Sequence, residues 1–278
     1  MATRETLGVL LVPLSGALGD ARALGCALRL AKAHPGTVVD ALIAAAVLAP
    51  MPILAGVDGL IPFDPLQSAM NEIERARRQH ARDNFQQLAQ TATDIARLLE
   101  DAQPLGEALS QRALLADYVL LPGPVDQAPG VDPLLLQTVL FDCGRPLLLA
   151  AGQSAAADAP VLVAWNGGAE AARAISAAKP MLSGCSEVVI AQVGAGATLE
   201  ALAPVLDYLE RHGVGAQPRV LAGSGGHAGA ALLEEAQRLG AGLLVMGAYG
   251  HGRARQLIFG GTTRHVIDHA RLDVLLAH

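Results

Sequence analysis

One pattern of apolar segments occurs twice along this chain of 278 residues. Three pairs of segments carry the repeat: 10–16 with 161–167, 117–123 with 242–247, and 146–150 with 273–277. Such self-similarity indicates one structural unit that is written twice. The stretch between the copies, residues 152–160, is small, polar and ends in proline, as expected of a linker. We therefore expect a first domain over 1–151, a linker over 152–160 and a second domain over 161–278.

Within each copy, short apolar runs alternate with longer helical patterns, which is typical of βαβ units and a parallel sheet. In the second copy we expect strands near 161–165, 187–193, 217–221, 242–247 and 273–277, and helices near 169–182, 197–212, 227–239 and 262–270. In the first copy we expect strands near 7–14, 37–47, 117–122 and 146–150, a weak strand near 96–100, and a long helix over about 65–92. The charged residues 72–78 of that helix are interpreted as a solvated face.

A glycine-rich stretch follows the fourth apolar run of the second copy. Residues 247–263 (GAYGHGRARQLIFGGTT) join an expected buried strand to an expected helix. Glycine lets a backbone approach a ligand closely, and the amides and dipole at a helix N-terminus favour an anion. Arg253 and Arg255 add positive charge. The stretch favours a phosphate-binding loop, and the alternative is a glycine-rich surface turn whose arginines are solvated.

The spacing of Gly247, Gly250 and Gly260 resembles the nucleotide-binding signature of the universal stress protein family, G-2X-G-9X-G-(S/T). Gly261 stands where the family has Ser or Thr, and a hydroxyl follows one residue later at Thr262. The whole chain resembles the tandem, two-domain type of this family. The resemblance implies an α/β fold with two tandem doubly wound parallel five-stranded sheets, each of strand order 3-2-1-4-5, similar to adenine nucleotide alpha-hydrolases.

The resemblance also implies a site for ATP, with or without Mg²⁺, in the second domain. Open α/β sheets bind ligands where the strand order reverses, beyond the carboxyl ends of the strands. Asn166 stands where the family commonly has Asp, the backbone of Val193 would meet the adenine, and Met246 would pack beside the nucleotide. The full set of expected site residues is Ala164, Asn166, Val193, Met246, Gly247, Gly250, Arg253, Gly260, Gly261 and Thr262.

The first copy departs further from the family pattern. Its corresponding loop, residues 121–133, contains four prolines and two carboxylates, and Ser15 replaces the family's Asp. Proline lacks the amide that a phosphate would need. We therefore expect no nucleoside triphosphate here, and a degenerate domain with an architectural or regulatory role. The apolar segment 47–57 is expected to pack against a neighbour or line an interface.

Composition excludes several classes of function. A formal net charge of −6 and a pI near 5.7 argue against a nucleic-acid partner. Neither a membrane span nor a signal-peptide layout is visible, so we expect a cytoplasmic protein. The three cysteines form no CxxC pair and are expected to be packing thiols.

Two histidines one helical turn apart, His265 and His269, have the spacing of zinc ligands, but no third ligand is evident and we expect no metal site. No nucleophile elbow or Walker lysine motif is present. The favoured function is an ATP-binding stress-response protein. The alternatives are a nucleotide-free interaction scaffold and a weak ATP hydrolase that uses His251. Both copies end in a short apolar strand, so an intramolecular pseudo-dimer or a homo-oligomer is expected.

Overall fold

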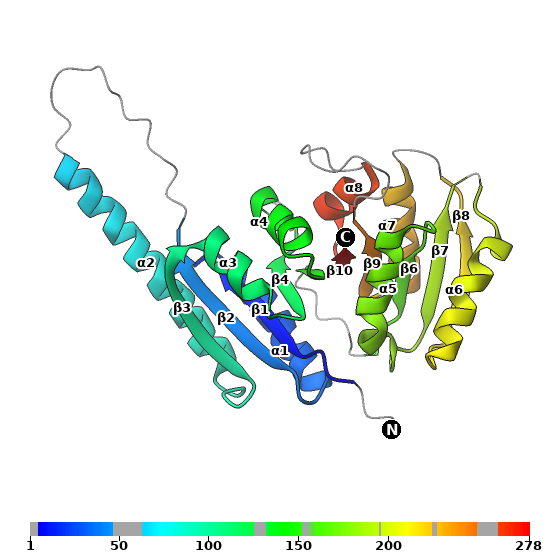
Figure 1. The fold of residues 1–278 in the computed structure, drawn as a ribbon, viewed down its shortest axis with the longest axis horizontal. Coiled ribbons are helices and arrows are strands. Elements are labelled where there is room, and N and C mark those ends of the chain that lie inside the picture. Colours follow the sequence, from blue (N-terminus) through cyan, green and yellow to red (C-terminus); the bar gives the residue numbers. More distant parts are fainter. Residues whose placement is uncertain are drawn as a thin grey trace, which may run out of the picture.

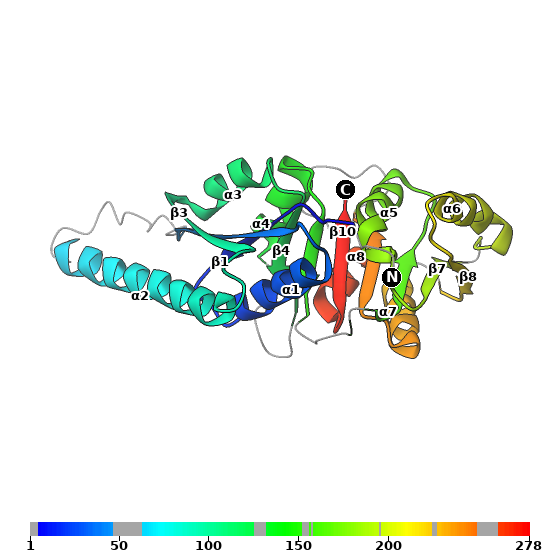
Figure 2. The ribbon, with the colours of Figure 1, turned by 90° about the horizontal axis from the view of Figure 1, so that it is seen from below.

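A computed structural model of the chain describes residues 5–46, 63–124, 132–151, 156, 158–194, 196–223, 227–248 and 261–278. Its centre is one ten-stranded sheet with helices on both faces (Figure 1). Figure 2 shows the two halves of the chain side by side, with β10 at the junction and α2 along the outer side of the first half.

The repeat in the sequence becomes a repeat of elements. The first half contains β1 (Val9–Leu14), α1 (Asp20–Ala33), β2 (Val38–Ala45), α2 (Phe63–Ala89), β3 (Ala96–Pro104), α3 (Leu105–Ala113), β4 (Tyr118–Pro122), α4 (Pro133–Gln137), the π-helical turn η1 (Thr138–Asp142) and β5 (Leu147–Ala150). The second half contains β6 (Val161–Ala164), α5 (Ala169–Leu182), β7 (Val188–Val193), α6 (Leu199–Arg211), β8 (Gln217–Leu221), α7 (Ala228–Leu239), β9 (Leu243–Gly247), α8 (Gly261–His269) and β10 (Asp273–Ala277).

The strands run in the order β3-β2-β1-β4-β5-β10-β9-β6-β7-β8. Each half therefore has the expected order 3-2-1-4-5, and all pairs within a half are parallel. The two five-stranded sheets are joined because β5 and β10 pair antiparallel. Leu148 pairs with Leu275, its counterpart in the sequence repeat, so the junction has the self-complementary form of a symmetric dimer contact.

The β5–β10 pair has consequences for assembly. Both strand-5 edges, which the sequence marks as candidates for pairing, are used within this one chain. Tyr118 reinforces the junction, since its hydroxyl donates a 2.5 Å hydrogen bond from β4 to the carbonyl of Ala177 in α5. A homo-oligomer of this chain would have to use another surface.

Helices cover each face of the sheet because alternate strand residues point to opposite sides. The apolar residues of α1, α2, α5 and α6 pack on one face, around Leu10, Val163 and Val245. Those of α3, α4, α7 and α8 pack on the other, around Leu11 and Leu244. The parallel strands are buried on both faces, which explains their continuous apolar runs.

The halves differ most after their second strand. Helix α2 has 27 residues, whereas its counterpart α6 has 13. The edge strand β3 has nine residues, longer than the weak strand expected near 96–100, and its counterpart β8 has five. The apolar segment 47–57, which was expected to pack against a neighbour, lies outside the described residues. Among the described residues, no helix combines the length and apolarity that a membrane span needs.

Candidate functional site

The sheet has two points where the strand order reverses, between β1 and β4 and between β6 and β9. We refer to each of these points, together with the adjoining end of the second strand of its half (β2 or β7), as the first and the second crevice. Because β5 and β10 are antiparallel while each half is internally parallel, the carboxyl ends of the strands in the two halves point in opposite directions. The crevices therefore open at opposite edges of the sheet.

Three expected site residues share one face of the second crevice. Ala164 pairs with Met246 on β9 and with Ala191 on β7, and Val193 lies two residues beyond Ala191. All of them pack with the cluster that α7 and α8 cover. They stand near the carboxyl ends of three adjacent strands and form an apolar patch beside the strand-order switch, in which Met246 is buried and Ala164 and Val193 are half-buried.

Asn166 lies in the turn between β6 and α5. Its side chain is exposed, and its Oδ1 accepts a 2.9 Å hydrogen bond from the amide of Gly168. Gly167 has a φ of +75°, and a Cβ added there would meet no described atom within 4 Å. Among the described residues, none packs against this turn at Gly167.

Gly247 has a packing role that the sequence does not reveal. A Cβ at this position would lie 2.5 Å from the amide nitrogen of Ala171 and 2.7 Å from the carbonyl carbon of Glu170. The end of β9 thus lies directly against the first turn of α5, and any side chain would collide with backbone. Glycine is required here whether or not a ligand approaches.

In the first half the equivalent contact has the glycine on the helix side and the larger residue at the end of the strand. Pro122 ends β4 where Gly247 ends β9, and Gly19 precedes α1 where Glu170 stands in the second half. A Cβ at Gly19 would lie 2.9 Å from Cβ of Pro122. In each half the small residue on one side makes room for the larger residue on the other.

The last two expected residues within the described chain begin α8. Gly261 is exposed and Thr262 is half-buried. Helix α7 lies close to this end, since a Cβ at Gly229 would lie 3.0 Å from the carbonyl oxygen of Thr262 and 2.9 Å from Cβ of His265. The expected site residues Gly250, Arg253 and Gly260 lie outside the described residues, as do Arg255 and His251.

The two histidines of α8 contact each other. The His265 and His269 rings stack with centroids 4.3 Å apart, and Nδ1 of His269 is 2.9 Å from the carbonyl oxygen of His265. Within the described part of the chain, no group of three or more His, Cys, Asp or Glu side chains is placed to hold a metal ion.

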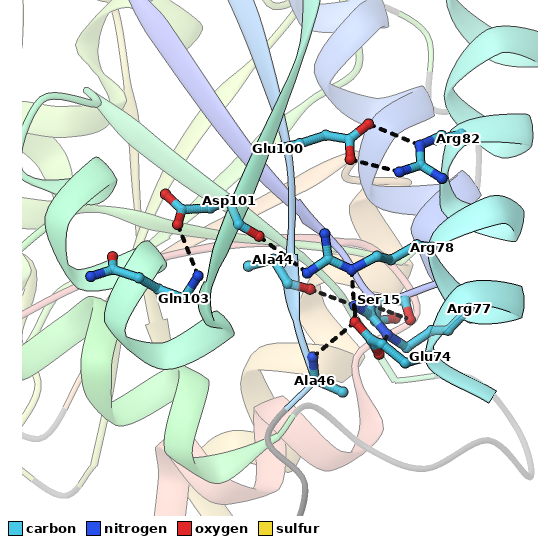
Figure 3. Close-up of polar contacts among 10 residues, drawn as sticks. All are labelled: Ser15, Ala44, Ala46, Glu74, Arg77, Arg78, Arg82, Glu100, Asp101 and Gln103. Carbon is cyan, nitrogen blue, oxygen red and sulfur yellow. Dashed lines mark hydrogen bonds and ion pairs between the residues drawn. The ribbon is translucent and has the colours of Figure 1, made fainter. Parts of the chain in front are cut away.

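The first crevice is occupied by charged side chains of α2 that the sequence analysis did not assign to a site (Figure 3). Arg77 of α2 donates from Nη1 to the carbonyl of Ser15 at 3.0 Å and from Nη2 to the carbonyl of Ala44. Glu74 holds the same guanidinium with two hydrogen bonds of 2.7 and 2.8 Å. These contacts lie at the carboxyl ends of β1 and β2.

The charged stretch 72–78 is therefore not simply a solvated face. The side chains of Glu74, Arg77 and Arg78 are only 23%, 18% and 22% exposed, whereas Ile73 is 69% exposed. Arg78 donates to Glu74 at 2.8 Å and to the carbonyl of Asp101 at 3.2 Å. Glu72 and Arg75 are exposed as expected, but the interpretation was wrong for Glu74, Arg77 and Arg78, because these side chains find partners near the carboxyl ends of β1, β2 and β3.

A buried carboxylate completes the first crevice. Asp20 is 1% exposed and accepts hydrogen bonds from the Ser15 amide (3.0 Å), the Ser15 hydroxyl (2.9 Å) and the Gly16 amide (2.7 Å). Burial raises the pKa of Asp20, while these three bonds and Arg77 oppose the rise. The amides of Ser15 and Gly16 thus donate to Asp20 of the same chain.

Comparisons with known proteins place this geometry in a family. The model of the universal stress protein family matches residues 186–278, which span β7 to the end of β10. Over these residues the chain is similar to the universal stress protein family. No curated protein matches the chain.

Solved structures extend the likeness to both halves. A universal stress protein from Archaeoglobus fulgidus DSM 4304 superposes with a TM-score of 0.73 at 17% identity, over 97% of each chain. A putative universal stress protein from Pseudomonas aeruginosa UCBPP-PA14 gives a TM-score of 0.59 at 15% identity, over 99% of this chain and 93% of the other. At these identities the comparison concerns the fold. It confirms the expected universal stress protein fold for the chain as a tandem.

Proposed function

We propose that the second half binds ATP, or a related adenine nucleotide, in the second crevice, and that the chain is a stress-response protein in which nucleotide occupancy biases partner binding or assembly. The observation that carries the proposal is the apolar surface of Ala164, Val193 and Met246. These residues meet at the carboxyl ends of adjacent strands, at the strand-order switch, where open α/β sheets bind ligands.

The second crevice offers chemistry suited to both ends of a nucleotide. An apolar surface suits a planar base, and the exposed Asn166 side chain can accept and donate hydrogen bonds. Helix α8 begins at Gly261, so its first-turn amides and its dipole favour an anion. We propose that Gly247, Gly250, Arg253, Gly260, Gly261 and Thr262 surround the phosphates, and that Mg²⁺ would be held mainly by the phosphates themselves.

The absence of a hydroxyl at Gly261 favours a second candidate, a nucleotide-free interaction scaffold of the same fold. Glycine offers no side-chain donor to a phosphate. Thr262 lies next in α8, half-buried, and would have to supply the hydroxyl instead. Weak ATP hydrolysis would in addition require a general base.

Thermal unfolding with and without millimolar Mg-ATP tests the proposal. At 100 times its dissociation constant, a ligand that binds only the folded state stabilises it by about 2.7 kcal/mol. We expect the transition temperature to rise by several degrees. No rise, together with no nucleotide carried through purification, would favour the scaffold.

Position 261 allows a gain-of-function test. Gly261→Ser restores the hydroxyl that the family signature has, and Gly261→Ala makes the same backbone change without it. We expect Gly261→Ser to bind ATP about tenfold more tightly than Gly261→Ala, corresponding to about 1.4 kcal/mol. Thr262→Val should weaken binding by a similar factor. Equal affinities for all these variants would place the phosphates elsewhere.

A further inference from the structure

Arg77 is held as a bound planar cation would be held. Its Nη1 and Nη2 donate to the carbonyls of Ser15 and Ala44, which lie at neighbouring strand ends. Its Nε and Nη2 donate to the carboxylate of Glu74. A guanidinium has five donors in a fixed fork, so a site that supplies two carbonyls and a carboxylate matches it closely. Figure 3 shows these acceptors around the single side chain.

The strand register identifies the position that Arg77 occupies. Leu10 pairs with Val39 between β1 and β2, as Val161 pairs with Val188 between β6 and β7. Counting five residues along each partner strand makes Ala44 the counterpart of Val193. The guanidinium thus reaches, in the first crevice, the backbone position that the proposed nucleotide site offers in the second.

Helix α2 lies directly on this position. Gly16 has a φ of +81°, and a Cβ added there would lie 2.5 Å from the carbonyl oxygen of Arg77. The amide of Ala46 adds a 3.4 Å hydrogen bond to Glu74. The hydrogen bonds from Arg77 lower the pKa of Glu74 to about 2, although burial acts to raise it. This carboxylate is therefore charged at neutral pH. The receptor and its occupant are therefore oppositely charged and tightly packed.

The anion-binding side of the same turn is also occupied. Asp20 takes the amides of Ser15 and Gly16 and the hydroxyl of Ser15. In the second half the residue at the position of Asp20 is Ala171, which offers no carboxylate. Backbone amides and backbone carbonyls at the first crevice are thus both hydrogen-bonded to side chains of the same chain.

We propose that the first crevice is a guanidinium receptor occupied by the chain's own Arg77, and that this internal ligand keeps nucleotide out of the first half. The statement about nucleotide rests on the proposed function of the second half. The statement about the receptor stands independently of it. Together they predict that one chain binds at most one nucleotide.

Chemical rescue tests the receptor without any nucleotide. Arg77→Ala removes the occupant, so the carbonyls of Ser15 and Ala44 lose this donor, and Glu74 keeps only Arg78 and the amide of Ala46 among the partners described above. Millimolar methylguanidine should then restore more than half of the lost transition temperature, because it returns a planar cation to the same acceptors. If Arg77→Ala is unfolded, refolding in methylguanidine followed by circular dichroism is the same test. A folded variant that methylguanidine does not stabilise overturns the proposal.

Two controls make the result specific. Arg211→Ala removes an arginine that is 74% exposed and pairs with Asp207 in its own helix, so methylguanidine should not change the transition temperature of this variant. Arg77→Lys keeps the charge but loses the fork, and it should stay destabilised. Rescue of Arg211→Ala to the same degree would overturn the proposal, because it would reveal a general solvent effect.

Calorimetric titration of the unaltered chain with Mg-ATP counts the sites. One site per chain supports the closure of the first crevice, and two sites overturn it. The rescue experiment separates this proposal from the proposed function. Rescue with no nucleotide bound would leave the receptor established and reject the nucleotide site, whereas one bound nucleotide without rescue would do the reverse.

Discussion

Gly16 and Gly167 occupy equivalent turns, and both have a positive φ, yet their surroundings are opposite. A Cβ at Gly16 would overlap the backbone of α2, whereas one at Gly167 would enter open space as far as the described residues reach. The order of the strands is the same in both halves. The comparison teaches that the sheet creates the crevice, while the helix after the second strand decides whether it is open.

The largest difference is expected from alanine at these two glycines. A non-glycine residue at positive φ costs about 1–2 kcal/mol, and the clash with backbone at Gly16 adds about 1–3 kcal/mol. We expect Gly167→Ala to lose only the first amount in free energy of unfolding, and Gly16→Ala to lose both. Urea denaturation monitored by circular dichroism measures this. Equal losses would show that α2 does not lie tightly on the first crevice.

A smaller difference should appear in acid. The pKa of Glu74 is held at about 2, below about 4.3 for an unfolded chain, so its ion pair stabilises the fold above the unfolded pKa. This contribution disappears as the pH falls from about 4.3 toward 2, because the unfolded state then binds a proton that the folded state does not take up until about pH 2.

Glu74→Gln should therefore be less stable than the unaltered chain at neutral pH, by about 1–3 kcal/mol, and the gap should close in acid. Urea denaturation at a series of pH values checks this. Asp207→Asn in α6 is the matched control, because exposed ion pairs contribute little. A gap that stays constant with pH would mean that Glu74 acts through packing alone.

The smallest effect is expected at Ser15. Ser15→Ala removes one hydroxyl donor from Asp20 and leaves the two amide donors in place. A loss of about 1 kcal/mol in the free energy of unfolding is typical of one such bond. A loss several times larger in the same urea experiment would indicate that the whole turn rearranges.

Much of the fold was readable from the sequence, because apolar runs of strand length stand between helical patterns. The expected helix over 169–182 has those bounds in the structure, and β8 and β10 match the expected strands 217–221 and 273–277. The antiparallel pairing of Leu148 with Leu275 was harder to foresee. An apolar edge shows only that a strand needs a partner, and the sequence left a second chain open as that partner.

The filled first crevice could not be predicted in the same way. Arg77 and Ser15 are 62 positions apart in the sequence. A run of charged residues on a helix also looks the same in the sequence whether its side chains are solvated or paired. In the structure Ile73 of that run is exposed while Glu74, Arg77 and Arg78 are not, and the sequence alone does not show which side of the helix meets the strands. Gly247 illustrates the converse, because a glycine assigned to ligand approach also has a purely steric reason to be there.

The covalent link between the halves has an evolutionary consequence. In a dimer of identical chains, every substitution appears at both sites at once, so a residue that blocks one pocket blocks its twin. Here the self-complementary contact of β5 with β10 joins two segments that are encoded separately. An internal ligand such as Arg77 could therefore arise in the first half alone. The second half was free to retain or to lose a ligand of its own.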